Sequence, residues 1–214
     1  MQTMQVAPVT LEGRRVRLEP MRMEHLDELA AVALDASVWR WMPVHVQTRE
    51  HLRTWMEQAL DQAAQGRALP WVTRALTDGK MVGSTRFMDI DTRNRGLEIG
   101  GTWLAPAWQR TGINLEAKYL QLTHAFEELG AIRVALKTHH GNVQSQTAIA
   151  ALGAKHEGTF RNHMIMPDGS YRHSAWFSVT VEDWPKVKAG LERRMGTSRL
   201  KTSHPANGDS EAKK

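Results

Sequence analysis

Residues 103–114 read WLAPAWQRTGIN and lead from an apolar, strand-like end through Pro106 into a polar turn and then a helix. The segment holds no Asp or Glu, although an acid is favoured at a helix start because the helix dipole is positive there. The first backbone N–H groups of a helix have no partner within it. Gly112, without a Cβ, lets a ligand come close to them, and the guanidinium of Arg110 suits phosphate oxygens. This pattern indicates a phosphate-binding helix start.

An ordinary solvated turn between a strand and a helix is the alternative interpretation of the same residues. The segment is not a P-loop, because no lysine follows the glycine in a GK[ST] arrangement. It does not contain the GxGxxG dinucleotide fingerprint either. The local pattern therefore leaves phosphate binding and a plain turn both open.

The pattern on either side of this segment predicts a mixed α+β fold. A long helix over 112–129 carries one apolar stripe and ends at Gly130, and it joins a strand over 96–105 to a strand over 132–138. A helical crossover of this kind makes the two strands parallel. Further strands are predicted over 14–20, 70–76 and 80–90, with a hairpin over 155–181, and helices over 23–34, 49–66 and 142–152 and after Pro185. These elements predict a mostly antiparallel sheet with one parallel pair.

Length and composition indicate one soluble domain. The chain has 214 residues, of which 41% are hydrophobic and 24% charged. It contains no cysteine, which removes disulfides, thiolate zinc sites and a cysteine nucleophile. No signal peptide and no apolar run of about 18 residues is visible, so we expect a cytoplasmic protein without a membrane partner. Residues 1–9 are predicted to be a flexible N-terminus and residues 196–214 a disordered tail.

A net charge of +5 and a pI near 9.7 first suggest a nucleic-acid partner. The tail holds four basic and two acidic residues, which leaves the body only mildly basic. A small polyanionic ligand explains that excess equally well, and no helix has a dense Lys/Arg face. Direct nucleic-acid binding is therefore ranked last among the hypotheses.

Three motifs together resemble one family. QRTGIN after GTWLAPAW resembles the Q/R-x-x-G-x-G/A pyrophosphate loop of the GCN5-related N-acetyltransferases (GNAT), GNVQSQTAIAALGA resembles that family's N-x-x-S helix, and RNHMIMPDGSYRHSAWFSV resembles its closing hairpin. The resemblance covers roughly residues 10–188 and is strongest to the RimJ/RimL-like branch, which acylates amines, including ribosomal-protein N-termini, from acetyl-CoA. It implies a single acyl-CoA N-acyltransferase domain over 10–195, a parallel pair splayed at the cofactor site, helices on both sheet faces, and a homodimer.

The same resemblance implies which residues bind the cofactor acetyl-CoA. The loop would hold the pyrophosphate through backbone amides, the strand before it would pair with the pantetheine, and the 142–152 helix would lie near the thioester. These residues are Trp103, Leu104, Gln109, Arg110, Thr111, Gly112, Ile113, Asn114, Asn142 and Ser145. The chain departs from the family at three positions: Asn114 replaces a Gly or Ala, Ile149 replaces the general-acid tyrosine, and His173 replaces an acid of the hairpin.

Without cysteine, an acyl-cysteine intermediate cannot form, so the amine must attack the thioester directly. Ser145 is the candidate donor to the leaving sulfur, because Ser145, Ile149 and Leu152 share one helix face. A small hydroxyl satisfied by the helix backbone is the alternative. Glu98 is the candidate base or amine-orienting carboxylate, since a carboxylate in a central strand is costly unless it is paired or useful. A salt bridge of Glu98 with Arg86 or Arg95 is its alternative.

Other polar and aromatic residues are weaker candidates. Trp39 and Trp41, in SVWRWMP, border the acceptor side in the related fold and are predicted to line the acceptor pocket, with simple packing as the alternative. Asp89 and Asp91 could bind a cationic substrate or simply belong to a turn. His139 and His140 precede the 142–152 helix and could act near the thioester or be solvated. No HExxH or comparable spacing exists, so we expect no metal.

The sequence therefore predicts an acetyl-CoA-dependent N-acetyltransferase that acts on a primary amine of a peptide or a small molecule. A non-catalytic acyl-CoA-binding protein of the same fold is the alternative, because the family's tyrosine is missing.

Overall fold

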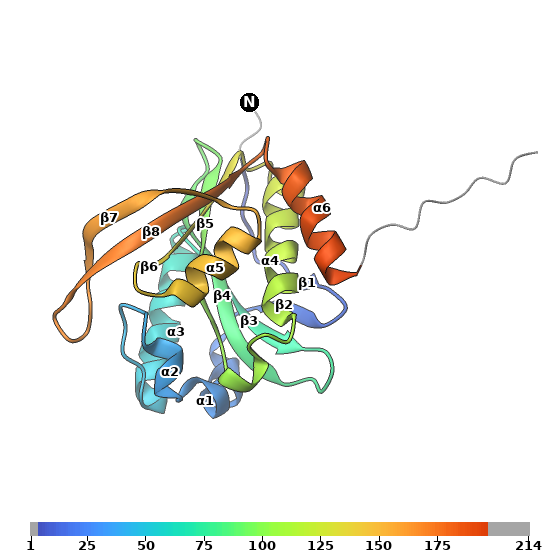
Figure 1. Ribbon diagram of the computed structural model, residues 1–214. Helices are drawn as coiled ribbons and strands as arrows, with labels where there is room; N and C mark the ends of the chain where they lie inside the picture. The colour runs from blue at the N-terminus through green and yellow to red at the C-terminus, as the bar shows by residue number, and fades with distance from the viewer. Residues whose placement is uncertain (1–3, 197–214) are drawn as a thin grey trace, which may run out of the picture.

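The computed structural model describes residues 4–196 of the chain. Eight strands form one sheet in the order β1-β2-β3-β4-β5-β6-β8-β7 (Figure 1). They are β1 (Leu11–Glu12), β2 (Val16–Pro20), β3 (Leu69–Ala75), β4 (Met81–Asp91), β5 (Gly96–Leu104), β6 (Arg133–His139), β7 (Lys155–Ile165) and β8 (Tyr171–Thr180). Neighbouring strands are antiparallel except β5 and β6, which are parallel. The predicted mixed fold with one parallel pair is confirmed.

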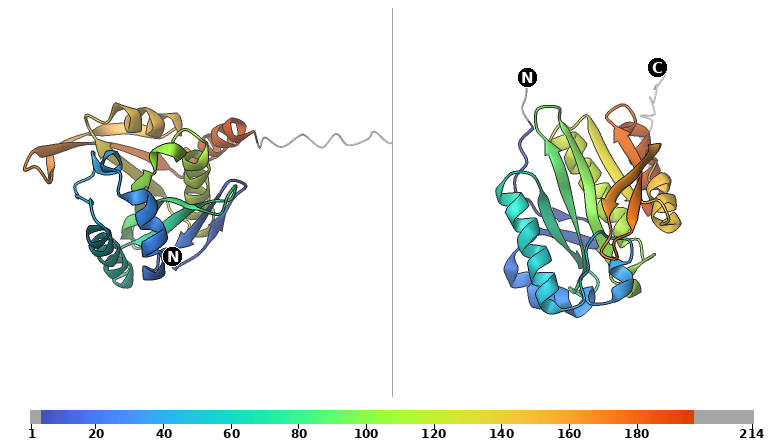
Figure 2. Two further views of the ribbon diagram at one scale, coloured as in Figure 1. Left: turned by 90° about the horizontal axis from the view of Figure 1, so that it is seen from below. Right: turned by 90° about the vertical axis from the view of Figure 1, so that its left-hand side faces the viewer.

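Helices cover both faces of the sheet (Figure 2). They are α1 (Leu26–Ala33), α2 (Ala36–Trp39), α3 (Arg49–Ala64), α4 (Ile113–Thr123), α5 (Val143–Ala151) and α6 (Trp184–Met195). Two 3₁₀ turns, η1 (Met23–His25) and η2 (Pro106–Trp108), and one π-helical turn, η3 (His124–Glu128), complete the set. Apolar residues of α4, α5 and α6 share one core, and those of α1, α2 and α3 share another. We call the two sides of the sheet the α4 face and the α3 face.

The parallel pair separates partway along its length. Pairing runs from Gly96 with Arg133 to Glu98 with Ala135 and then stops. Beyond that point β5 continues to Leu104 beside β4, and β6 continues to His139 beside β8. We call residues 99–104 and 136–139 the splayed ends. The ladder between β4 and β5 is irregular between Ser84 and Arg86, opposite Gly101, which has a φ of 56°. Beyond Glu98, the edge of the β5 backbone that faces β6 therefore has no described strand hydrogen-bonded to it. Helix α4 begins shortly after β5 ends.

Local signals predicted several helix ends correctly. Thr48 caps α3 by accepting the N–H of His51, and Asn142 caps α5 by accepting the N–H of Ser145. The helix expected over 112–129 is regular only to Thr123 and continues as η3. The last helix begins at Trp184, with Pro185 in its first turn, and has 12 residues. The short elements β1 and α2 were not predicted.

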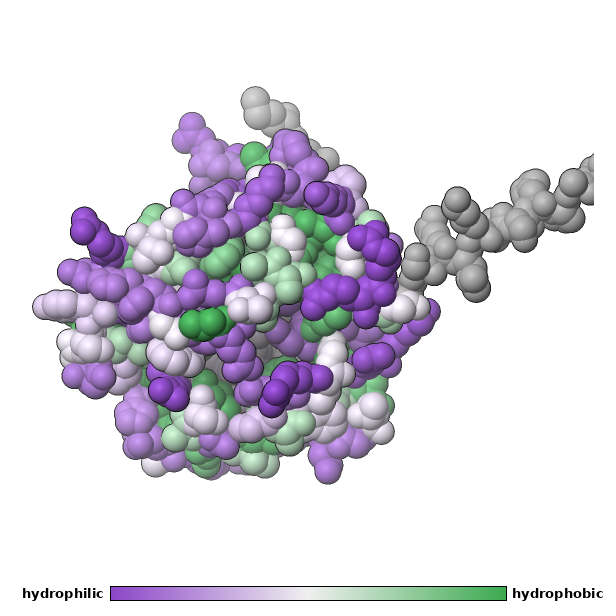
Figure 3. All heavy atoms as spheres, viewed as in Figure 1, coloured by the Kyte–Doolittle hydropathy of each residue, from purple (hydrophilic) through white to green (hydrophobic). Residues whose placement is uncertain are grey.

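The N-terminal segment lies against the sheet in the part that is described. Met4 is buried, and Val9 accepts a hydrogen bond from the Trp71 indole at 2.7 Å, although the sequence suggested flexibility for residues 1–9. Apolar side chains at positions 4, 6 and 9 pack against the core and account for this placement. Of the predicted tail, residues 197–214 lie outside the described residues, as do residues 1–3. On the face shown in Figure 3, hydrophilic and hydrophobic side chains are interspersed.

Candidate functional site

The loop before α4 has the backbone shape of an anion site. Gly112 has a φ of 91° and stands at the N-cap of α4, where no side chain caps the helix. Arg110 also has a positive φ, 60°, and its side chain is exposed. A Cβ at Gly112 would lie 2.6 Å from the Nη1 atom of Arg15, the far end of a flexible side chain, so the left-handed conformation is what favours glycine here. The first N–H groups of α4 are left available to a ligand.

Two side chains of the loop are used to hold the loop itself. The Gln109 amide donates to the Leu104 carbonyl at 3.2 Å, and the Thr111 hydroxyl donates to the Trp108 carbonyl at 2.7 Å. The sequence interpretation treated both as extra ligand-binding side chains. Their bonds leave the backbone N–H groups and the Arg110 guanidinium as the donors that face outward.

Glu116, which the sequence analysis missed, is a buried acid in the first turn of α4. Its carboxylate accepts the backbone N–H groups of Arg14, Arg15 and Val16 at 3.0, 2.7 and 3.1 Å. The Glu116 carboxylate thus stabilises the turn between β1 and β2. It also holds Arg15 beside the loop, where the Nη1 atom of Arg15 lies 3.4 Å from the Thr111 carbonyl oxygen. An acid in this turn is compatible with anion binding because three donors already surround it.

The other predicted cofactor residues flank the splayed ends. Trp103 and Leu104 pair with Ser84 and Gly83 of β4 through one edge of β5, while their other edge has no partner in β6. The Trp103 side chain is buried on the α3 face, 5.3 Å from Trp39, and its indole nitrogen has no described partner. Asn142 uses its side chain as the α5 cap. The backbone of β5, more than these side chains, is therefore available to bind a ligand.

Ser145 lies on the face of α5 that its spacing from Ile149 and Leu152 predicted. It is half-buried in the first turn of α5, and Ile149 and Leu152, on the same face, are buried in the α4-face core. Its hydroxyl makes no hydrogen bond to any described residue, so the alternative of a hydroxyl satisfied by the helix backbone is not what is observed. Ile149, at the position of the family's tyrosine, is core and carries no proton donor.

Glu98 is the last residue of β5 that pairs with β6, and it is 2% exposed. Its carboxylate lies 2.5 Å from the ammonium of Lys137 on β6, and not beside Arg86 or Arg95 as the alternative had it. Lys137 also lies 3.5 Å from Asp89 and stacks 4.8 Å over the Trp176 ring. Burial raises the pKa of Glu98 to about 7, against the opposing effect of Lys137. A carboxylate that titrates near neutrality can accept a proton from an amine.

A hollow of about 410 Å³ lies beside Glu98 on this part of the sheet. It is lined by Asp89, Asp91, Asn94, Gly96, Leu97, Glu98, Ile132, Arg133, Ala135 and Trp176. Asp91 accepts the N–H of Asn94 in the turn between β4 and β5, as the turn interpretation predicted. The lining holds the carboxylates of Asp89, Asp91 and Glu98 and one guanidinium, that of Arg133, so acidic groups outnumber basic ones, which suits an approaching ammonium group.

The two residues predicted to line the acceptor pocket, Trp39 and Trp41, lie in different environments. Trp39 is buried with Trp55 and Trp103, and its indole donates to the Ala33 carbonyl at 2.6 Å, which is what simple packing requires. Trp41 is half-buried and stacks 4.9 Å from His139. His139, the last residue of β6, stacks on His140 in the turn before α5, and burial lowers the pKa of His139.

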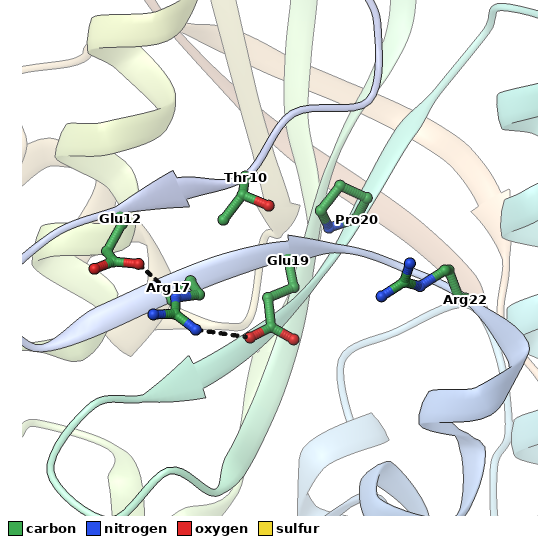
Figure 4. A pocket seen from close by; sticks show the side chains of 6 residues that line it. All are labelled: Thr10, Glu12, Arg17, Glu19, Pro20 and Arg22. Carbon is green, nitrogen blue, oxygen red and sulfur yellow. Dashed lines mark hydrogen bonds and ion pairs between the residues drawn. The ribbon is translucent and has the colours of Figure 1, made fainter.

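A second hollow, of about 450 Å³, lies over the edge strands β1 and β2 (Figure 4). Arg17 lies 2.5 Å from Glu12 and 3.7 Å from Glu19 within it, whereas Arg22 lies 3.8 Å from Glu24, outside the lining. It is lined by residues remote from the splayed ends, and no part of the candidate site borders it. No helix within residues 4–196 has both the length and the apolarity that a membrane span needs.

Comparison with known proteins identifies the family. The acetyltransferase (GNAT) domain model matches residues 15–155. A Bacillus subtilis protein named "Putative ribosomal N-acetyltransferase YdaF" is 31% identical over 113 residues, and this match spans 53% of the chain and 61% of that relative. The curated relative is thus matched over less than two thirds of its length.

Solved structures agree over more of the chain. A GCN5-related N-acetyltransferase from Brucella melitensis is 31% identical with a TM-score of 0.80, covering 88% of this chain and 86% of that one. Mycobacterium smegmatis RimJ, solved with CoA-disulfide, has a TM-score of 0.76 at 23% identity over 89% of this chain and 96% of that one, a likeness of fold alone. With the splayed parallel pair and the glycine loop before α4, these matches show that the chain belongs to the GNAT acetyltransferase family.

Proposed function

We propose that this protein transfers an acetyl group from acetyl-CoA to a primary amine without a covalent enzyme intermediate. The observation that carries the proposal is the placement of the buried Glu98 carboxylate where β5 and β6 stop pairing. From that point the free edge of β5 leads to the uncapped start of α4. A carboxylate at one end and an anion site at the other are what this reaction requires.

The residues present fit the cofactor. The free β5 edge at Trp103 and Leu104 suits pairing with the amides of pantetheine, and the glycine at the start of α4 keeps a Cβ out of the loop that would hold the pyrophosphate. Arg110 and Arg15 add positive charge at that loop. Bound acetyl-CoA supplies the acetyl group as a thioester, whose carbonyl carbon is open to attack by a neutral amine.

The chain's own residues provide the proton transfers. Glu98 would take a proton from the incoming ammonium or orient the amine, and Lys137 holds its carboxylate in place. Ser145, with a free hydroxyl, would donate a hydrogen bond toward the sulfur. Over the reaction one C–N bond forms and one C–S bond breaks. The ammonium gives up two protons in all: one would pass to Glu98 and on to solvent, and the other would be gained by the thiol. No side chain forms a bond to the acetyl group.

The acceptor proposed is an amine of a peptide N-terminus or a small molecule, in a RimJ/RimL-like enzyme. The names of the Bacillus relative and of RimJ support this branch. A non-catalytic acyl-CoA-binding protein is the second candidate, favoured by one observation: the family's tyrosine position is the buried Ile149.

Thiol release in the presence of acetyl-CoA and a panel of amines tests the proposal. The protein has no cysteine, so a thiol reagent reports only the CoA that is formed. We expect release that requires both substrates, with the N-acetyl product found by mass spectrometry. Tight acetyl-CoA binding with no release across the panel would favour the non-catalytic candidate instead.

A further inference from the structure

Arg86, on β4, is a buried cation on the α3 face, and no carboxylate of the described residues forms an ion pair with it. It is 9% exposed, and its guanidinium lies 5.0 Å over the Trp55 ring. It also lies against Gly101, where a Cβ would come within 2.4 Å of its Nε atom. Arg86 is therefore fixed between α3 and the irregular part of β5, at the start of the splayed ends.

Stacking on Trp55 leaves the hydrogen-bonding capacity of this guanidinium unused. A ring contacts one flat side of the group, whereas its five N–H donors point outward in its plane. No described residue accepts a hydrogen bond from the Arg86 side chain or forms an ion pair with it. Glu98, whose charge acts on Arg86, is already bound to Lys137. None of the Arg86 nitrogens is among the fully enclosed side-chain atoms without a partner, so an acceptor group brought by a ligand can reach these donors.

Arg172, on β8, adds a second such group from the other side of the site. It is 5% exposed and donates only to neutral acceptors, the Ser174 hydroxyl at 3.0 Å and the Trp41 carbonyl at 3.2 Å. Among the described residues, no carboxylate lies within ion-pair distance of it. The Glu98 carboxylate acts on both arginines, so the three side chains belong to one electrostatic neighbourhood.

We propose that the acceptor carries a carboxylate close to its reactive amine, and that Arg86 binds this carboxylate. The proposal rests on the function proposed above and narrows its substrate class. A carboxylate brings two oxygens in the geometry of the guanidinium fork, and its single charge balances that of Arg86. A neutral carbonyl would leave the buried charge uncompensated. The carboxylate belongs either to a free α-amino acid or to an acidic side chain next to a peptide N-terminus.

Binding of matched acceptors to the CoA-loaded protein tests this, since CoA without an acetyl group prevents turnover. One pair is serine and serinamide, and the other is Ser-Glu-Ala-Ala-amide and Ser-Gln-Ala-Ala-amide, each measured by calorimetry. We expect the carboxylate member of one pair to bind at least about tenfold more tightly than its amide. The pair that discriminates identifies the source of the carboxylate, and equal binding within both pairs would overturn the proposal.

Variants assign the effect to Arg86. Arg86→Gln should remove the discrimination while leaving the CoA affinity within about twofold, and Arg86→Lys should keep part of it because the charge remains but the fork is lost. Arg67→Gln, at an exposed arginine after α3, is the matched control and should change nothing. Thermal unfolding checks that each variant is folded. If Arg86→Gln weakened CoA and left the discrimination intact, Arg86 would serve the cofactor and the proposal would be wrong.

The two proposals fail in different ways. Amine acetylation without preference for carboxylate-bearing acceptors would remove this inference and leave the acetyltransferase standing. Arg86-dependent binding of the carboxylate member without any acetyl transfer would do the reverse.

Discussion

The two ends of the candidate site are built in different ways. At the cofactor end, the candidate residues 109–114 are contiguous. The side chains of Gln109 and Thr111 form hydrogen bonds to backbone carbonyls just before this segment, so the backbone N–H groups are left to bind the ligand. At the proposed acceptor end, the candidate groups are charged side chains from β4, β5, β6 and β8, including Arg86, Glu98 and Lys137. The first end depends on backbone conformation and the second on which strands are neighbours.

This contrast makes the two ends sensitive to different changes. The cofactor end should tolerate most side-chain substitutions except at Gly112, where the positive φ restricts the conformation. The acceptor end should respond to single charge removals, because the Glu98 and Arg86 side chains are buried there.

The largest effect is expected for Gly112→Glu. A side chain at a φ of 91° is strained, and a carboxylate would meet the phosphate at the helix start. We expect acetyl-CoA affinity to fall at least about 100-fold by calorimetry, an estimate from the loss of charge-assisted bonds. Gly79→Glu, at a φ of 74° with open space around it, is the matched control and should bind normally. Unchanged affinity in Gly112→Glu would show that the loop is an ordinary turn.

Glu98→Gln tests the acceptor end. With a pKa of about 7, Glu98 must lose its proton to act as a base, so kcat/KM of the parent should rise with pH through about 7 and then level off. The variant should lose about 100-fold in kcat and show no such limb, as for removal of a general base. Asp78→Asn, in the exposed turn between β3 and β4, should keep the parental profile. An unchanged profile in Glu98→Gln would move the base role to water.

Glu116→Gln tests whether the cofactor end depends on a long-range contact. The glutamine amide has only its oxygen as an acceptor, because its –NH2 group can only donate. At least one of the three backbone N–H groups would therefore be left without a partner. We expect a loss of about 2 kcal/mol in the free energy of unfolding, measured by urea titration. Glu57→Gln, on the exposed side of α3, should have the stability of the parent. Equal stability of the two variants would contradict this role.

Lys118 gives a smaller, pH-dependent effect on the α4 face. It is buried and donates to Thr85, Thr102 and Gln121 at 3.1, 2.8 and 3.0 Å, and burial lowers its pKa to about 7 from 10.5. Between these values the unfolded chain binds more protons than the folded one, so stability should rise with pH over this window, by up to about 1 kcal/mol per pH unit. Lys118→Met should lack this rise, while the exposed Lys80→Met should keep it.

The smallest effect is expected for Ser145→Ala. If the hydroxyl donates to the leaving sulfur, kcat should fall by less than about tenfold, the value of one neutral hydrogen bond, with acetyl-CoA affinity nearly unchanged. Thr147→Ala, an exposed hydroxyl on the same helix, is the control. Identical kcat values for Ser145→Ala and the parent would remove Ser145 from the chemistry.

The sequence by itself predicted most of the helices and strands and the glycine loop before α4, although β1, α2 and the π-helical geometry of η3 were not predicted. Apolar periodicity, the Thr48 and Asn142 caps, and the glycine before α4 act within a few residues, so their consequences are visible without knowing the fold. The parallel orientation of β5 and β6 could also be predicted from the local sequence, because a helix connects the two strands.

Only the tertiary structure decided the partners of the buried charges. Glu98 meets Lys137 39 positions later, and Glu116 meets the β1–β2 turn about 100 positions earlier. Among residues 4–196, no acid forms an ion pair with Arg86. Such contacts depend on strand order and register, which set the side chains that face each other across a sheet. The sum of many distant packing contacts fixes both, and no short stretch of the chain encodes them.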